Sequence, residues 1–193
     1  MAKEKKKNRF YYNDDFLGSP QGRSIRILSE YYGPLKKIKK NKIYDTIVFF
    51  GSARIKPRDK AEAYLKQLSP SASNKEKVRA KKDIEISRYY EDARQLAYKL
   101  TKWSKNLKSK KSRYIITSGG GGGIMEAANR GAKEADGISM GLTISLPFEA
   151  TSNEFISKDL DLKFHYFFMR KFWFIYLAKA LVVWPGGFGT LDE

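Results

Sequence analysis

The sequence contains no cysteine and only one histidine, His165, among its 193 residues. Without cysteine there is no disulfide framework, no thiolate zinc site and no cysteine nucleophile. A single imidazole leaves none to spare for a metal-binding cluster or a Ser/His/Asp relay, and we expect His165 to serve packing or an edge hydrogen bond. We therefore expect no metal and no cofactor. Any catalysis would rest on carboxylates, Arg, Lys, hydroxyls or backbone amides.

An uncharged apolar run of membrane-spanning length is also lacking. The most apolar stretch, residues 164–184, carries Arg170 and Lys171 near its middle and Lys179 further on. Charges at that depth are costly in a bilayer. The basic start MAKEKKKNRF is followed by YYNDDF rather than by an apolar run, which argues against a secretory signal. We expect a cytoplasmic protein with no membrane partner.

Acidic residues are scarce, since 21 Asp and Glu face 38 Lys and Arg and give a net charge of +17. Hydrophobic residues at 41% are nevertheless too many for a disordered chain. Basic charge is densest over residues 101–113, with six basic residues and no acidic one. A solvated lysine-rich surface is the plainer interpretation, because no nucleic-acid-binding motif accompanies the charge. A nucleic-acid-associated role stays an alternative that the sequence does not favour.

Short β-rich runs alternate with helical patterns along most of the chain, and this alternation predicts an α/β fold. It is typical of a Rossmann-like parallel sheet with helices on both faces. The expected strands are residues 45–50, 113–117, 141–146, 160–164 and 180–184. The expected helices include 124–134, 169–179 and one whose sheet-facing side holds Tyr89, Ala93, Leu96, Leu100 and Trp103. Residues 1–44 are expected to form a basic arm with a short helix at 25–32, and residues 45–193 the nucleotide-binding domain.

Two glycine loops follow two of the expected strands. The first consists of Gly119, Gly120, Gly121, Gly122 and Gly123, and the second contains Gly186, Gly187, Gly189 and Thr190. A strand, a glycine run and a helix together form an anion site, because backbone N–H groups are uncovered and the helix dipole adds positive potential. The dinucleotide fingerprint fails at Ile124, and no Lys-Ser or Lys-Thr pair completes a P-loop. If the two strands are neighbours, both loops face one crevice, and we expect a phosphate there.

Charged residues beside these loops are the remaining site candidates. Arg170 and Lys171 interrupt an apolar helix, and adjacent helical residues point about 100° apart, so we expect Arg170 to face the crevice. Ser52 and Arg54, after the first strand, are expected to contact phosphate or base, with turn chemistry and a surface Arg as the alternative. Glu126 is a second acid candidate, with a helix-terminal surface carboxylate as the alternative.

Four motifs occur in one order: SGGGGGIMEAANRGA at 118–132, GLTISLPF at 141–148, FMRK at 168–171 and PGGFGTLDE at 185–193. Together they resemble the Lonely Guy (LOG) family, many of whose members carry an older lysine decarboxylase label. The resemblance covers residues 45–193. It implies a phosphoribohydrolase that hydrolyses the N-glycosidic bond of a nucleoside 5′-monophosphate to free base and ribose 5-phosphate.

The resemblance further implies site roles and a substrate. Arg170 and Glu193 become the catalytic pair, Lys171 completes the basic pair at the site, and the second glycine loop with Thr190 holds the phosphate. Relatives that share the FGSAR and GIMEAANRGA segments look similar to AMP nucleosidases. This suggests AMP, or a modified AMP such as a cytokinin riboside monophosphate, and a homodimer. A non-catalytic nucleotide sensor is the alternative.

The sequence ends at Glu193, which the resemblance places in the first turn of a helix. We therefore expect the C-terminal part of the fold to be missing. The chemistry is consistent on its own terms, because a carboxylate close to C1′ stabilises the positive charge of a glycosidic transition state. Glu193 lies about one helical turn beyond Thr190, so a phosphate bound at the loop would place the ribose beside it.

Overall fold

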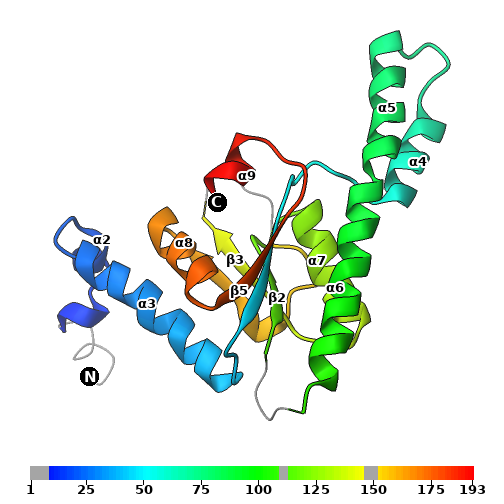
Figure 1. Cartoon of the computed structure of the whole chain (residues 1–193). Helices are drawn as coiled ribbons and strands as arrows, with labels where there is room; N and C mark the ends of the chain where they lie inside the picture. Colours follow the sequence, from blue (N-terminus) through cyan, green and yellow to red (C-terminus); the bar gives the residue numbers. More distant parts are fainter. Residues whose placement is uncertain (1–8, 109–112, 146–151) are drawn as a thin grey trace.

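The computed structural model describes residues 9–108, 113–145 and 152–193, in which one parallel sheet is flanked by helices (Figure 1). The strand order is β4-β3-β2-β1-β5. The strands are β1 (Thr46–Phe50), β2 (Ile115–Ser118), β3 (Ser139–Ile144), β4 (Asp161–Phe164) and β5 (Ala178–Val183). All pairs are parallel. The predicted α/β fold with a parallel sheet is confirmed.

Each face of the sheet carries its own helical layer (Figure 1). Helices α3 (Arg23–Lys40) and α8 (Phe167–Tyr176) cover one face, and α6 (Arg88–Asn106) and α7 (Ile124–Glu134) cover the other. Alternate residues of β1 divide between the two cores, since Val48 and Phe50 pack toward the first layer and Ile47 and Phe49 toward the second. Both faces of β1 are therefore buried, as expected for a central parallel strand.

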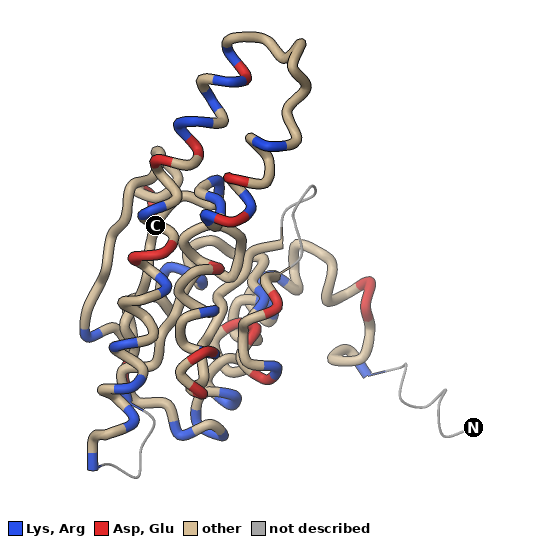
Figure 2. The backbone as a smooth tube through the Cα atoms, turned by 90° about the vertical axis from the view of Figure 1, so that its right-hand side faces the viewer, with Lys and Arg blue, Asp and Glu red and all other residues tan. Residues whose placement is uncertain are grey.

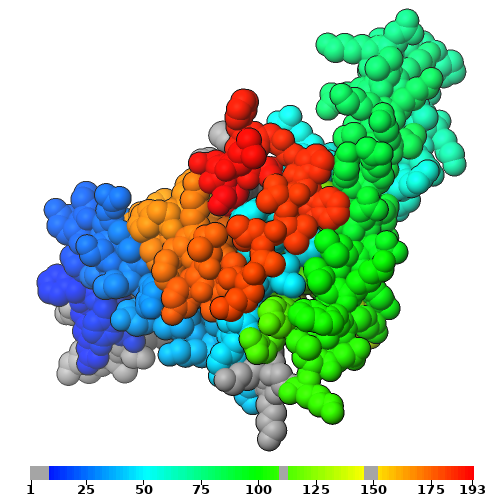
Figure 3. Space-filling model, viewed as in Figure 1, coloured from blue at the N-terminus to red at the C-terminus, as the bar shows by residue number. Residues whose placement is uncertain are grey.

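The remaining helices lie outside these layers. Helices α4 (Arg58–Gln67) and α5 (Asn74–Ile86) form a pair that projects away from the sheet, visible in the tube view (Figure 2) and in the space-filling view (Figure 3). Helix α5 begins with a capping box between Ser73 and Glu76. The short elements are η1 (Phe10–Tyr12), α2 (Asp14–Gly18), η2 (Lys158–Leu160) and α9 (Phe188–Asp192). Within the described residues, no helix is both long enough and apolar enough to cross a membrane.

The segment predicted as a basic arm contains a helix much longer than the expected 25–32, because α3 runs over 18 residues. Pro34 lies inside it and lacks the N–H that would bond to the carbonyl of Glu30 one turn earlier. Trp173 of α8 donates its indole N–H to that carbonyl at 2.9 Å. The Glu30 carboxylate also accepts the backbone N–H of His165 at 2.7 Å. Helix α3 is thus joined to α8 and to the end of β4.

On α6 the predicted Ala93 is fully buried and the predicted Tyr89, Leu96 and Leu100 pack on the core while partly buried, but the most buried face is rotated by about one residue. The buried residues are Tyr90, Ala93, Ala97 and Thr101, whereas Trp103 is 47% exposed. These residues face α7 rather than the sheet alone, and a Cβ on Gly131 of α7 would lie 2.1 Å from the backbone oxygen of Arg94. Small side chains allow this close approach, so helix-to-helix packing selects the alanine-rich face over the more aromatic one.

Some boundaries also differ from the predictions. The predicted helix over 169–179 ends at Tyr176, and β5 begins at Ala178, two residues before the predicted strand. Strand β3 begins two residues earlier than predicted, and residue 146 at its predicted end lies outside the described residues.

Candidate functional site

A cavity of about 550 Å3 opens at the carboxyl ends of β1, β2 and β5. From β1 the chain adds β2, β3 and β4 outward on one side, and it then returns to place β5 on the other side of β1, so the strand order reverses at β1. The glycine loops do not follow neighbouring strands, because β1 lies between β2 and β5, yet both reach the cavity. Of the predicted site residues, those that line it are Ser52, Arg54, Gly119, Gly120, Gly121, Arg170, Gly187, Gly189, Thr190 and Glu193.

The first glycine loop is shaped by close backbone contacts. Gly120 and Gly123 have φ angles of 78° and 63°, which other residues adopt only with strain. A Cβ on Gly123 would lie 2.2 Å from the backbone oxygen of Ser52, and Ile124 N–H donates to that same oxygen at 3.1 Å. The loop is therefore fixed against the turn that follows β1. Gly122 and Gly123 face this turn and do not line the cavity, contrary to the prediction.

The amides of this loop differ in their hydrogen bonds and in their access to the cavity. Gly120 N–H donates to the Ser118 hydroxyl at 3.1 Å. The backbone N–H groups of Gly121, Gly122 and Gly123 donate no hydrogen bond to any described residue. Of these three residues Gly121 lines the cavity, and its amide beside the start of α7 favours an electron-rich ligand group.

Two asparagines that the sequence analysis missed hold the loop. Asn153 Nδ2 donates to the carbonyls of Gly120 at 3.1 Å and Gly121 at 2.9 Å, and to Asn129 Oδ1 at 3.0 Å. The Ser118 hydroxyl donates to the same Asn129 oxygen at 2.7 Å. Asn129 is fully buried on the alanine-rich face of α7. A polar residue on such a face requires partners, and this was the one sequence signal of the network.

Arg170 faces the cavity as predicted and is only 6% exposed. Its Nε donates to the carbonyl of Leu142 at 2.7 Å, and its Nη1 forms an ion pair with the Glu193 carboxylate. A Cβ on Gly119 would lie 2.6 Å from Arg170 Nη2, so the guanidinium lies directly against the first glycine loop. The ion pair thus connects α8 with the loop region that follows β5.

The second oxygen of the Glu193 carboxylate, Oε2, is buried and makes no hydrogen bond to the described residues. Burial raises the pKa of Glu193 above its ordinary value, and the cationic Arg170 opposes part of this effect. The carboxylate therefore offers one oxygen fixed by Arg170 and one oxygen without a partner.

Lys171 and Gly186 do not line the cavity, in contrast to the prediction. Lys171 lies one residue round the helix from Arg170, and its ammonium pairs with the Asp192 carboxylate at 2.9 Å. A Cβ on Gly186 would lie 2.2 Å from Thr190 Oγ1, so the lack of a side chain at Gly186 leaves room for the threonine side chain. Both residues therefore lie next to residues that line the cavity, Asp192 and Thr190.

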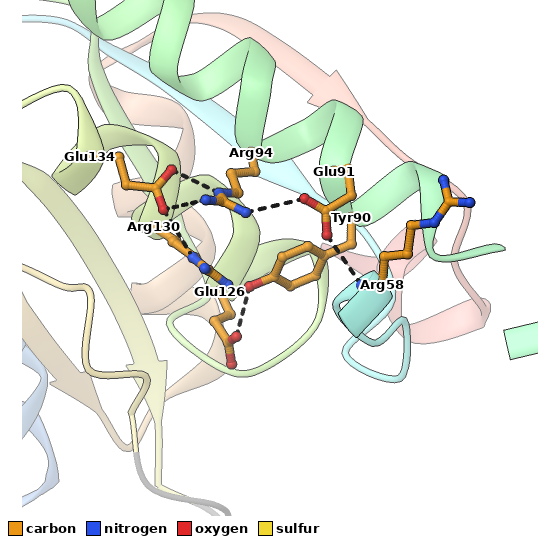
Figure 4. Close-up of polar contacts among 7 residues, drawn as sticks. All are labelled: Arg58, Tyr90, Glu91, Arg94, Glu126, Arg130 and Glu134. Carbon is orange, nitrogen blue, oxygen red and sulfur yellow. Dashed lines mark hydrogen bonds and ion pairs between the residues drawn. The ribbon is translucent and has the colours of Figure 1, made fainter. Parts of the chain in front are cut away.

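Glu126 is also absent from the cavity lining, because its carboxylate points to α6 (Figure 4). The buried Tyr90 donates its hydroxyl to Glu126 at 2.7 Å, and burial raises the pKa of that phenol. Nearby, Arg94 forms a two-bond contact with Glu134, which also accepts from Arg130. These contacts connect α6 with α7, and Glu126 takes part in them rather than in the cavity lining.

Ser52 and Arg54, which follow β1, form a hydrogen bond within a turn and also line the cavity. The Ser52 hydroxyl accepts the backbone N–H of Arg54 at 3.1 Å, and both residues line the cavity.

The exposed His165 ring contacts Tyr166 edge-on at 4.8 Å, as a packing role predicts. In the described part of the chain, no cluster of three His, Asp or Glu side chains is placed to hold a metal ion.

Comparison with known proteins finds one family model that matches part of the chain. Residues 125–193 match the family model described as "Possible lysine decarboxylase". A solved structure titled "X-ray structure of TM1055", a Northeast Structural Genomics Consortium target, aligns with 24% sequence identity and a TM-score of 0.46. The alignment covers 77% of this chain and 65% of that one, so the chain spans about two thirds of its length. No curated protein matches.

Proposed function

We propose that this chain belongs to the family whose model, described as "Possible lysine decarboxylase", matches residues 125–193, which is the LOG family of the resemblance, and that it is a phosphoribohydrolase. Its reaction is hydrolysis of the N-glycosidic bond of a nucleoside 5′-monophosphate, with AMP or a modified AMP as substrate. The observation that carries the proposal is the buried Arg170–Glu193 pair in a cavity lined by two glycine loops.

The proposed binding mode follows from the lining residues. The 5′-phosphate lies against the second glycine loop, where Gly187, Gly189 and Thr190 reach the cavity. Thr190 supplies a hydroxyl donor, and the glycines let the backbone approach closely. Arg54 is exposed at the cavity and adds positive charge. The ribose then lies toward Glu193, three residues further along the chain.

Glu193 supplies the chemistry in this proposal. When the bond between C1′ and the base nitrogen breaks, its electron pair leaves with the base and positive charge develops on the sugar. The carboxylate stabilises that charge through Oε2, while Arg170 holds Oε1. Water adds its hydroxide to C1′, and its proton passes to the departing base. Free base and ribose 5-phosphate are the products.

The lysine decarboxylase label itself fits the cavity poorly. A pyridoxal-phosphate decarboxylase needs a lysine for its aldimine. Among the described residues that line the cavity there is no lysine, and the nearby Lys171 is paired with Asp192. The lining favours phosphate binding with a carboxylate over Schiff-base chemistry.

The test is a panel of nucleoside monophosphates with chromatographic detection of free base and ribose 5-phosphate. Adenine released from AMP, and none from adenosine, supports the proposal. No base from any monophosphate refutes it, and AMP binding without turnover identifies a sensor. The resemblance also implies a cytoplasmic homodimer, whose mass light scattering would measure.

A further inference from the structure

A glycine loop presents donors to a ligand only if its carbonyl groups are occupied elsewhere. Each residue carries one N–H and one C=O, and a carbonyl that turns toward the cavity would repel an electron-rich group. In the first glycine loop, the carbonyls of Gly120 and Gly121 both accept from the single Asn153 side chain. The Gly120 carbonyl also accepts the backbone N–H of Asn153 at 2.9 Å.

Asn153 is itself fixed in orientation. Its Oδ1 accepts the backbone N–H of Phe155 at 3.2 Å, which leaves Nδ2 to serve as the donor toward the loop. The same Nδ2 reaches Asn129 Oδ1, where the Ser118 hydroxyl also donates. Asn129 and Ser118 are both fully buried. The network therefore connects the segment after β3, helix α7 and the end of β2.

We propose that Asn153 is a positioning residue for the first glycine loop. It holds the carbonyls of Gly120 and Gly121 away from the cavity, so that the Gly121 amide, which borders the cavity, stays available as a donor. The effect on the loop is independent of the reaction. The effect on substrate rests on the proposed function.

The first experiment measures the loop without any ligand. In ¹⁵N-labelled protein, Asn153→Ala removes the donor and Asn153→Asp keeps the shape but replaces the donor nitrogen with an acceptor oxygen. We expect the amide resonances of residues 119–123 to broaden or split in both variants. The control is Ser157→Ala, which removes a hydrogen bond of the same segment to Ser139 N–H, away from the loop. Unchanged loop resonances in the Asn153 variants overturn the proposal, whatever the hydrolysis assay shows.

The second experiment measures kinetics with AMP. We expect kcat/KM to fall about tenfold in both Asn153 variants, mostly through KM, and to change less than about twofold in Ser157→Ala. Equal losses in all three variants, in step with their melting temperatures, would indicate a structural role only and overturn the proposal. A wild-type KM in Asn153→Asp overturns it too, because shape rather than donation would then suffice. If the wild type releases no base, the proposed function fails while the resonances still decide on Asn153.

Discussion

Substituting Glu193→Gln removes the charge of the proposed catalytic carboxylate while keeping its shape. The amide oxygen still accepts from Arg170 Nη1, so the contact that positions the side chain survives. The variant is therefore expected to fold and to bind AMP, and the loss should appear in kcat.

The magnitude follows from the environment of the carboxylate. The Glu193 side chain is 20% exposed, so an effective dielectric constant of about 20 applies. A full charge about 4 Å from the sugar would then contribute about 4 kcal/mol, and a partly developed charge about 2 kcal/mol. We expect kcat for adenine release to fall about 30-fold to 1000-fold, with KM changed less than about threefold.

The control is Asp192→Asn, which removes the neighbouring carboxylate. Asp192 also borders the cavity, but its side chain is 68% exposed and pairs with Lys171. Solvent screens such a charge, so kcat should stay within about fivefold of the wild type. Chromatographic rates at saturating AMP for both variants decide the matter. A Glu193→Gln protein that keeps more than a third of wild-type kcat would refute the assigned role.

The same variant reports on the raised pKa of Glu193. Because burial raises the folded pKa above the ordinary value of 4.5, folding favours the protonated form. The stabilising contribution of protonated Glu193 to the free energy of unfolding is fully present below pH 4.5 and is lost as the pH rises through the pKa of the folded state. The wild type should therefore lose stability relative to Glu193→Gln over that window, measured by urea unfolding at several pH values. The acidic limb of the kcat–pH profile should also lie above pH 4.5. A difference in unfolding free energy between the two proteins that stays constant at all pH values would contradict the raised pKa of Glu193.

Three further substitutions test the supporting structure. Arg170→Met conserves volume but leaves the Glu193 carboxylate without its counter-ion, and should lower the unfolding free energy by about 2 to 3 kcal/mol in urea titrations. Gly123→Ala places a Cβ 2.2 Å from the backbone oxygen of the turn after β1, and should cost at least about 2 kcal/mol in thermal unfolding. Tyr90→Phe leaves Glu126 without its donor and should cost about 1 to 2 kcal/mol, with kcat unchanged because neither residue lines the cavity. A kcat loss in Tyr90→Phe would restore Glu126 as a site residue.

Local sequence patterns predicted the elements whose own residues determine them. The helix Ile124–Glu134 has the predicted bounds, because a glycine run ends where an alanine-rich stretch begins. The inward orientation of Arg170 was expected from helical geometry, since adjacent residues point about 100° apart and the two charges therefore face different surroundings. By contrast, the most buried face of α6 depends on which helix packs against it. Helix α7 packs closely there because the side chains at the contact are small, and the largest apolar side chains of α6 do not determine this face.

The site was predictable where the chain itself brings residues to the strand ends, and unpredictable where side chains meet across elements. Glu126 lies three residues after the first glycine loop, yet its carboxylate accepts from a tyrosine of α6 and does not line the cavity. Asn129 and Asn153 are 24 residues apart and meet only because the chain runs through β3 and returns beside the loop. The buried asparagine on the alanine-rich face of α7 indicated that a polar partner must exist. Only the fold could identify that partner as Asn153, whose side chain also donates to two carbonyls of the first glycine loop.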